Sequence, residues 1–388
     1  MLMFSEPEGA FLGTPYALQR QAPLYLRFDH RPYWPAIRTV LGGTETLAAV
    51  ALALGLGEQW LSYSRTSRHY DVPHRYRNRY YTWRFITGAM DRLDEKGLIY
   101  HDRRPPGQRG WQSAAKAKPE LCEIIADLTR CTPPMLTWPS ETIVLRDANK
   151  APADYSDTRA TLRMRKKLCK INEGICGLGL PPTICAPLVR IFNRNFQRGG
   201  RLYARGGGWQ VLSKEARRSI QIVGEPVVEL DFSCLHPSLL YGKIGGRMPA
   251  DAYYLPPWPR SLVKRALLIL INASTRRKAQ LAIAYHEAMV GVALPATSEA
   301  LAAAERLIID ICALHHPITS AFGSDEGAQL MRLDSDIAEA VLLDLLRQGD
   351  VALPVHDSFI APASKRAELE RAMIENAERI AGLKLNVS

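Results

Sequence analysis

The sequence has neither the cysteine pattern of a secreted protein nor an apolar run long enough to cross a bilayer. Its seven cysteines are an odd number without Cys-x-x-Cys spacing, which excludes a disulfide scaffold. The gaps between Cys169, Cys176 and Cys185 match no zinc knuckle, which disfavours a zinc site. "LAAVALALGLG" is too short for a membrane span, and "MLMFSEPEGAFLG" lacks the basic and apolar parts of a signal peptide. We therefore expect a soluble, cytoplasmic protein with reduced thiols and no membrane partner.

Acidic residues are also scarce relative to basic ones. The chain has 39 Asp and Glu against 50 Lys and Arg, a formal net charge of +11. This balance points to a polyanionic partner, nucleic acid first, although a basic surface also serves solubility. With 388 residues, of which 47% are apolar, the chain is long enough for two or three domains. "CTPPMLTWPS" and "DANKAPADYSD" favour a junction at 131–155, after a basic N-terminal module at 1–130.

The N-terminal module contains a pattern that resembles a winged helix, over about residues 45–130. We expect a recognition helix at 82–96, ended by Gly97, and two short strands around a wing at 103–110. Five apolar residues fall on one face of that helix: Trp83, Ile86, Ala89, Met90 and Leu93. Three arginines lie in the wing and are expected to contact a duplex: Arg103, Arg104 and Arg109.

Two basic segments lie outside the wing. Arginine pairs with phosphates and aromatic rings stack on bases, so the first segment, at 64–84, favours nucleic-acid contact; the alternative is a solvated face packed on another domain. The second, "TRATLRMRKKLCK" at 158–170, is helical in pattern and would grip a duplex backbone unless it is merely solvated. The segment at 64–84 interleaves tyrosines with six arginines: Arg65, Arg68, Arg75, Arg77, Arg79 and Arg84.

Further along, two aspartates each follow an apolar, strand-like run. Asp231 follows residues 227–230, and Asp357 follows "VALPV" at 351–355. Side by side, two carboxylates repel each other unless a cation lies between them. Two divalent ions about 3.5–4 Å apart would resolve the repulsion and activate a hydroxyl for phosphoryl transfer. The alternative, which spacing leaves open, is a pair of independent strand ends.

The stretches around these aspartates resemble polymerase motifs. "ELDFSCLHPS" at 229–238 resembles motif A of right-hand polymerases, and "VHDSF" at 355–359 resembles motif C of family A DNA polymerases and single-subunit phage-type RNA polymerases. "RSLVKRALLILINAS" at 260–274 resembles motif B, the fingers helix. "GGRLYA" at 199–204 resembles the glycine–arginine motif of the same enzymes. The four motifs occur in the family's order, which is more specific than any one of them.

The resemblance implies roles for individual residues. Asp231 and Asp357 would bind two Mg²⁺ ions, or Mn²⁺ in their place, with the Phe232 backbone carbonyl as a further ligand. Arg260 and Lys264, one helical turn apart, would bind the triphosphate of the incoming nucleotide. Lys264 would also protonate the pyrophosphate.

Further positions follow from the same resemblance. Arg265 adjoins the triphosphate site, and Arg201 would contact the nucleic-acid backbone. His356 would shape the primer terminus, unless it is a structural histidine. Where the family has Tyr-Gly after the motif B lysine, this chain has Asn272 and Ala273. By this resemblance, Asn272 would contact the incoming nucleotide. The aromatic side chain on which the templating base stacks in the family is missing.

His236, five residues after Asp231, occupies the position that faces the sugar in the enzymes this motif resembles. The DNA polymerases have a bulky residue there and the single-subunit RNA polymerases a small glycine, so by this resemblance a histidine predicts a preference for deoxynucleotides. The alternative is that His236 packs under the strand and bonds to a neighbour.

Together these patterns predict an α+β protein with a right-hand polymerase palm, an antiparallel sheet backed by helices. We expect a thumb-like, template-binding region at 156–225, and palm and fingers at 226–388, with reduced helical fingers at about 255–330. The expected partners are a DNA primer–template, for which RNA is an alternative template, nucleoside triphosphates and accessory replication proteins. Two alternatives are an RNA polymerase or primase that starts chains de novo, and a winged-helix DNA-binding protein with an inactive polymerase-like domain.

Overall fold

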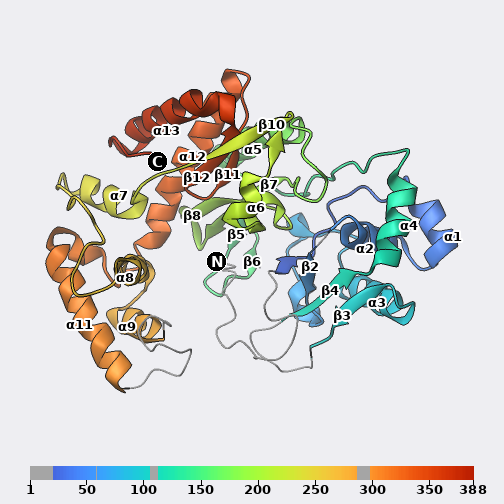
Figure 1. Cartoon of the computed structure of the whole chain (residues 1–388). Coiled ribbons are helices and arrows are strands. Elements are labelled where there is room, and N and C mark those ends of the chain that lie inside the picture. Colours follow the sequence, from blue (N-terminus) through green and yellow to red (C-terminus); the bar gives the residue numbers. More distant parts are fainter. Residues whose placement is uncertain (1–20, 58, 105–111, 286–297) are drawn as a thin grey trace. The chain divides into compact units, whose positions relative to one another are not determined.

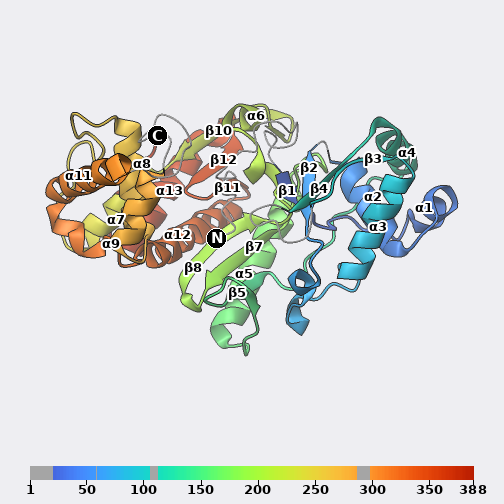
Figure 2. The same cartoon turned by 90° about the horizontal axis from the view of Figure 1, so that it is seen from below.

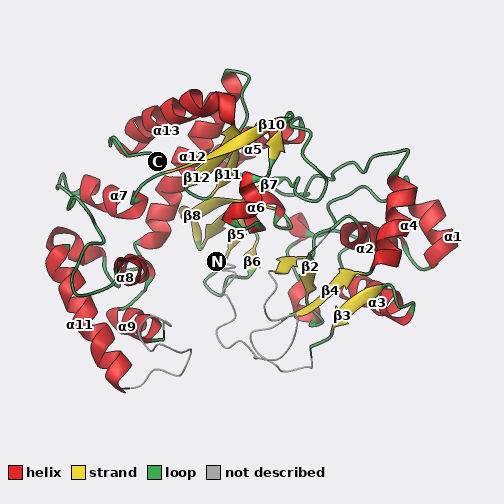
Figure 3. Cartoon of the chain, in the orientation of Figure 1, coloured by secondary structure: helices red, strands yellow, loops and turns green. Residues whose placement is uncertain are grey.

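The computed structural model describes residues 21–57, 59–104, 112–285 and 298–388 (Figure 1). The chain divides into two compact units. Unit 1 comprises Met1–Ile191 and Leu202–Val227, and unit 2 comprises Phe192–Arg201 and Val228–Ser388. Helices and small sheets occur in both, which confirms the predicted α+β class (Figure 3).

The first half of unit 1 is a sheet with helices between and after its strands. The strand order is β1-β2-β4-β3, in which β1 is parallel to β2 and the other pairs are antiparallel. Helix α3 directly precedes the β3–β4 hairpin, and β2 pairs with β4. The elements are β1 (Gln21–Pro23), α1 (Trp34–Leu41), α2 (Glu45–Gly55), β2 (Trp60–Tyr63), η1 (Ser67–Tyr70), η2 (His74–Tyr76), α3 (Trp83–Glu95), β3 (Ile99–Asp102), β4 (Ser113–Ala117) and α4 (Pro119–Thr129).

Helix α2 forms the core of this half. All of its residues from Thr46 to Leu54 are buried, and it packs against α3 and α4. Among the described helices, none alone is long and apolar enough to cross a membrane, although α1 and α2 together, bent by 92°, have the required length and composition.

Helix α3 confirms the helix predicted at 82–96. Gly97, with a φ of 70°, follows its last turn, a conformation that glycine adopts without strain. Trp83 differs from the prediction: it is 40% exposed, because its indole Nε1 donates to the Arg65 carbonyl at 2.8 Å instead of entering the core. The other predicted core positions are buried: Ile86, Ala89, Met90 and Leu93.

A second four-stranded sheet has the order β6-β5-β7-β8, with helix α5 packed on β5. The end of β7 and most of β8 fall within Phe192–Arg201, which belongs to unit 2. Strands β5 (Ile143–Arg146) and β6 (Pro152–Ala153) lie inside the segment 131–155, so this expected junction contributes strands to unit 1. The other elements are α5 (Arg159–Cys176), β7 (Leu188–Asn193), β8 (Asn195–Ala204), η3 (Gly208–Val211), α6 (Lys214–Arg218) and β9 (Gln221–Ile222).

Unit 2 contains strands β11, β12 and the end of β10, next to helices α12 and α13 (Figure 2). Strand β10 (Glu225–Asp231) begins in unit 1, where it pairs with β9, and ends beside β12. Helix α13 packs on both α12 and β12. The other elements are α7 (Leu235–Lys243), α8 (Arg260–Asn272), α9 (Arg276–Ala284), α11 (Ser298–Leu314), η4 (His316–Ala321), α12 (Gly327–Arg347), β11 (Leu353–Val355), β12 (Ser358–Pro362), η5 (Ala363–Lys365) and α13 (Arg366–Ala381).

Candidate active site

Strand β10 places Asp231 between two neighbouring stretches of backbone. On one side, the Phe232 amide donates to the Asp357 carbonyl at 3.3 Å. On the other, the amide and carbonyl of Asp231 both pair with Ser388 at 3.0 Å. Successive strand residues direct their polar backbone groups to opposite sides, so the Phe232 carbonyl faces the Asp357 side. The two aspartates therefore lie on adjacent backbones.

The local sequence explains why Asp231 is accessible. Leu230 and Phe232 are buried, whereas Asp231 between them is exposed, as the period of two in a strand requires. Immediately afterwards the chain leaves the strand, because Cys234 adopts a left-handed conformation, with a φ of 54°, and starts α7. The charge thus lies at the open edge of an otherwise buried strand end.

Asp357 lies in the two-residue turn between β11 and β12. The pairing of Val355 with Ser358 leaves only His356 and Asp357 in the loop. His356 has a φ of 61°, a conformation that costs a residue with a side chain about 1–2 kcal/mol. A positive φ at the first loop residue matches the twist of the flanking strands. Backbone strain of this kind concentrates at functional sites.

The ionised form of Asp231 is disfavoured in these surroundings. Partial desolvation, followed by the Asp357 carboxylate, raises the pKa of Asp231 to about 6, and Glu229 adds to this effect. Lys264 acts in the opposite direction without cancelling the shift. The carboxylates therefore lack sufficient positive charge, which a bound divalent cation would supply.

Helix α8 supplies the cations of the site. It begins at Arg260, and Lys264 follows one turn later; both are exposed. Tyr253, which is 4% exposed, links them: the Arg260 guanidinium carbon lies 5.1 Å and the Lys264 Nζ 5.8 Å from its ring centre. Such cation–ring contacts contribute about 0.5–1 kcal/mol each at exposed sites. Arg260 Nε also lies 2.8 Å from Asp251 Oδ2.

The donor set fits a hard divalent cation. Asp231 and Asp357 offer carboxylate oxygens, and the Phe232 carbonyl faces the side of the strand on which Asp357 lies. In the described part of the chain, no group of three or more His, Cys, Asp or Glu is placed to hold a metal ion. Mg²⁺ nevertheless suits this site, because it commonly binds one or two carboxylates together with substrate phosphates and water.

Arg201 and His236 converge on a buried carboxylate in α12. Asp334, whose side chain is 1% exposed, accepts from Arg201 Nε at 3.0 Å, and its Oδ2 lies 3.2 Å from His236 Nε2. Burial acts to raise the pKa of Asp334, but Arg201 and His236 outweigh burial and hold this pKa below its usual value. His236 is only 7% exposed. Its predicted contact with a sugar, and that of Arg201 with a nucleic-acid backbone, stay predictions; both side chains lie in this internal cluster.

Backbone conformation and close packing explain why "GGRLYA" begins with two glycines. Gly199 and Gly200 have φ values of 76° and 86°. A Cβ on Gly200 would lie 2.7 Å from the Phe192 ring and 3.0 Å from Ser335 Oγ of α12. A side chain there would push β8 away from α12, so glycine keeps Arg201 within reach of its carboxylate partner.

Two other predicted positions make no contact with the aspartates among the described residues. Arg265 is exposed on α8. The side-chain amide of Asn272 donates to the Leu268 carbonyl at 2.8 Å, and the residue packs closely against Gly327. Asn272 thus joins the end of α8 to the start of α12.

The wing arginines are only partly described, because residues 105–111, which include Arg109, lie outside the described ranges. Arg103 pairs with Asp91 of α3 at 2.7 Å. Arg104 pairs at 2.6 Å with the carboxylate that ends β3, and its side chain is 15% exposed. Both arginines are therefore tied to the base of the hairpin.

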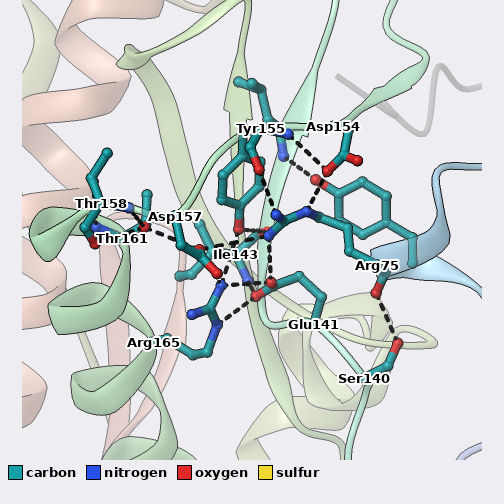
Figure 4. A network of polar contacts seen from close by, with 12 residues as sticks. Arg75, Ser140, Glu141, Ile143, Asp154, Tyr155, Asp157, Thr158, Thr161 and Arg165 are labelled. Carbon is teal, nitrogen blue, oxygen red and sulfur yellow. Dashed lines mark hydrogen bonds and ion pairs between the residues drawn. The ribbon is translucent and has the colours of Figure 1, made fainter.

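Arg75 and Arg165, from the two basic segments, meet at one carboxylate in unit 1 (Figure 4). Glu141, whose side chain is 6% exposed, lies 3.1 Å from Arg75 NH1 and 2.7 Å from Arg165 NH2. Arg75 also lies over the Tyr155 ring, 3.7 Å from its centre. Arg165 pairs further with Asp157 at 2.9 Å. These two arginines hold unit 1 together and are not available to phosphates.

Three residues of these clusters were not predicted from the sequence: Glu229, Tyr253 and Asp334. A signal existed for Glu229, which lies two residues before Asp231 on the same side of the strand. Asp334 interrupts an apolar helical stripe that includes Leu330 and Ile337, and an acid in such a stripe indicates a buried partner. Tyr253 lies in a loop and has no comparable signal.

A scan with protein-family models and a search of curated proteins found no match for this chain. Its function must therefore be inferred from the geometry and chemistry of these residues.

Proposed function

We propose that the protein is a nucleotidyltransferase, a template-dependent DNA polymerase that extends a 3′-hydroxyl with deoxynucleoside triphosphates. The observation that carries this proposal is that Asp231 and Asp357 lie on adjacent backbones, with the charges of Asp357 and Lys264 both acting on Asp231. The carboxylates supply metal ligands, and the cations at the start of α8 supply phosphate ligands. Phosphoryl transfer requires both, because its transition state is stabilised by positioning and charge.

In this proposal the β10–β12–β11 strands with α12 and α13 are the palm, and α8, α9 and α11 are the reduced fingers. The strand order supports this: Asp231 ends one strand, and Asp357 lies in the hairpin beside it. In unit 1, α3 followed by the β3–β4 hairpin, with β2 paired to β4, supports a winged helix.

Each residue of the site has a distinct role. Asp231, Asp357 and the Phe232 carbonyl would hold the ions, and Arg260 and Lys264 would bind the triphosphate. Two divalent ions, when bound, would activate the 3′-hydroxyl and stabilise the charge on the leaving pyrophosphate. Lys264, which is exposed and lies near Asp231, donates the proton that the pyrophosphate takes up.

The second candidate is an RNA polymerase or primase that starts chains de novo. The burial of His236 favours it, because a ring fixed on Asp334 is less available to exclude a 2′-hydroxyl. A winged-helix DNA-binding protein with an inactive palm is the candidate from another class. The raised pKa of Asp231 speaks against it, since a pure binding protein gains nothing from two repelling carboxylates.

Primer extension tests the proposal. Labelled DNA primers on DNA and RNA templates are incubated with dNTPs or rNTPs, in Mg²⁺ or Mn²⁺, together with unprimed templates. We expect extension with dNTPs on primed DNA, and its loss in Asp231→Asn and Asp357→Asn. Glu375→Gln, which neutralises an exposed carboxylate on α13, is the matched control and should extend normally.

Each other outcome selects a different function. Synthesis from unprimed templates with rNTPs would replace the DNA polymerase by the RNA polymerase or primase. Duplex binding without synthesis under any of these conditions would leave only the DNA-binding protein. Extension by Asp231→Asn at the wild-type rate would remove the two-carboxylate mechanism.

A further inference from the structure

Helix α5 is a rigid element of unit 1. It has 18 residues and begins with a capping box, in which Thr158 and Thr161 satisfy each other's backbone amides. The Asn172 side chain forms a pair of hydrogen bonds with the backbone of Leu188 in β7, at 2.7 and 2.9 Å. Arg165 fixes the same helix to Glu141, as Figure 4 shows. The orientation of the helix about its axis is therefore set.

The buried and exposed faces of α5 differ in character. At 100° per residue, the buried positions fall on one side of the helix. They are Thr161, Leu168, Ile171, Asn172 and Ile175. On the opposite side, within an arc of about 60°, lie four exposed cations, here called the α5 stripe. They are Arg159, Arg163, Lys166 and Lys170.

The α5 stripe lacks acidic partners. Within the described residues, none of its four cations forms an ion pair, and the Arg163 side chain donates one hydrogen bond, to the Arg159 carbonyl at 3.3 Å. Glu173, the one acidic residue of α5, accepts from Cys169 instead. By contrast, Arg165 on the flank of the helix is fully paired. The stripe therefore presents concentrated, uncompensated positive charge on a fixed support.

We propose that the α5 stripe binds the phosphate backbone of a nucleic-acid duplex. Three steps of 4, 3 and 4 residues separate its cations and span about 17 Å, the axial length of about five base pairs. Side chains of arginine and lysine at one-turn intervals suit successive phosphates, and such contacts carry affinity without sequence preference. This inference rests on the proposed function only in that the partner is a nucleic acid.

Fluorescence anisotropy with a labelled DNA duplex of about 20 base pairs, without nucleotide or divalent metal, tests the stripe. The variant is Arg163→Gln, Lys166→Gln and Lys170→Gln together, since glutamine retains helix propensity. Each phosphate contact contributes about 0.9 to the slope of log affinity against log salt, so we expect the slope to fall by about 2.7. At about 0.1 M salt, affinity should fall roughly 100- to 500-fold.

The matched control changes the net charge equally at another place. It carries three substitutions at exposed positions of α12 and α13: Arg347→Gln, Arg366→Gln and Arg371→Gln. This control triple should retain at least about half of the wild-type salt slope. Single-stranded DNA of the same length and vesicles of phosphatidylserine with phosphatidylcholine form two further arms.

The outcomes separate this surface from the proposed function. If the α5 triple binds duplex like the wild type while wild-type protein extends primers, the stripe is wrong and the polymerase stands. If duplex binding depends on the stripe but the protein never extends a primer, the stripe is supported and the proposed polymerase function is wrong. An α5 triple that loses only vesicle binding would overturn the stripe as a nucleic-acid surface in favour of an anionic membrane. Equal losses in the α5 and control triples would also overturn it, because only bulk charge would matter.

Discussion

Two carboxylates, Glu141 in unit 1 and Asp231 in unit 2, have opposite surroundings. Burial acts to raise the pKa of Glu141, but hydrogen bonds from Arg165 and from the Ile143 amide outweigh burial, and the pKa lies below its usual value. Asp231 has Asp357 and Glu229 as neighbours, and partial desolvation with these charges raises its pKa to about 6. The first carboxylate is neutralised by its own chain, whereas the second is not.

This difference distinguishes a structural cluster from a binding site. A carboxylate surrounded by arginines stabilises the fold only while all partners are present, because removal of one leaves uncompensated charge. Two carboxylates held together without sufficient positive charge destabilise the fold, and a ligand cation would relieve that cost. The same contrast applies to cations: Arg75 and Arg165 are paired, whereas the α5 stripe is not.

The largest expected effect is on catalysis at the uncompensated pair. Asp231→Asn and Asp357→Asn should each reduce nucleotide incorporation by about 1,000-fold or more, because each removes a ligand from a site that uses two ions. Single-turnover primer extension measures the rate, and circular dichroism checks the fold. Residual activity above about a tenth of wild type in either variant would contradict the site.

Neutralising Glu141 should instead affect stability. Glu141→Gln leaves two arginines facing an uncharged amide, and we expect the free energy of unfolding in urea to fall by about 3 kcal/mol. Asp154→Asn is the matched control, because Arg75, the partner of Asp154, keeps its ion pair with Glu141. It should lower the free energy of unfolding by less than about 1 kcal/mol, since the Asp154 side chain is 63% exposed. If Glu141→Gln is as stable as wild type, the network is not structural.

Tyr253 should control how well the two cations of α8 bind a triphosphate. Tyr253→Leu removes the ring under Arg260 and Lys264, and we expect KM for the nucleotide to rise about tenfold with a smaller change in kcat. Tyr253→Phe keeps the ring and loses only the hydroxyl, so its KM should stay near wild type. Equal KM increases in both variants would assign the effect to the hydroxyl.

The smallest expected effect is a gain in stability at Asp231. Its pKa of about 6 in the folded protein exceeds the usual value, so ionisation opposes folding. This cost is absent below the usual pKa of 3.8, is small at about pH 4, grows as the pH rises towards 6 and is complete above it. Asp231→Asn should therefore raise the free energy of unfolding by about 1 kcal/mol at about pH 7.5, after allowance for solvent screening, and change little at about pH 4.

Added Mg²⁺ gives that prediction a second readout. It should stabilise the wild type and not Asp231→Asn, because only the ionised pair binds the cation. Urea unfolding with and without Mg²⁺ measures this. A variant that is less stable than wild type at neutral pH would mean that Asp231 has a structural role like that of Glu141.

Local patterns in the sequence predicted elements better than partners. The run before Asp231 and the apolar face of α3 identify a strand and a helix, because burial imposes periods of 2 and 3.6 residues. The pairing of Arg201 with Asp334 joins residues separated by 133 positions, and no local period encodes such a contact. The same holds for Trp83, whose hydrogen bond to the Arg65 carbonyl draws it out of the core. Several of the arginines that the sequence assigns to nucleic acid have acidic partners that only the fold reveals, among them Arg75, Arg103, Arg104, Arg165 and Arg201.

The pairing of Asp231 with Ser388 has a consequence for synthesis of the protein. Ser388 follows Asp231 by 157 positions (388 − 231), so the ribosome makes β10 long before the segment that covers its outer side. At about 5–20 residues per second, that interval lasts roughly 8–30 s. For most of that interval both edges of the strand "VVELDF" lack their partners, because β12 on the other side is also made late. The strand is then exposed to association with other nascent chains. The candidate site is therefore complete only after the ribosome has added Ser388, the backbone partner of Asp231.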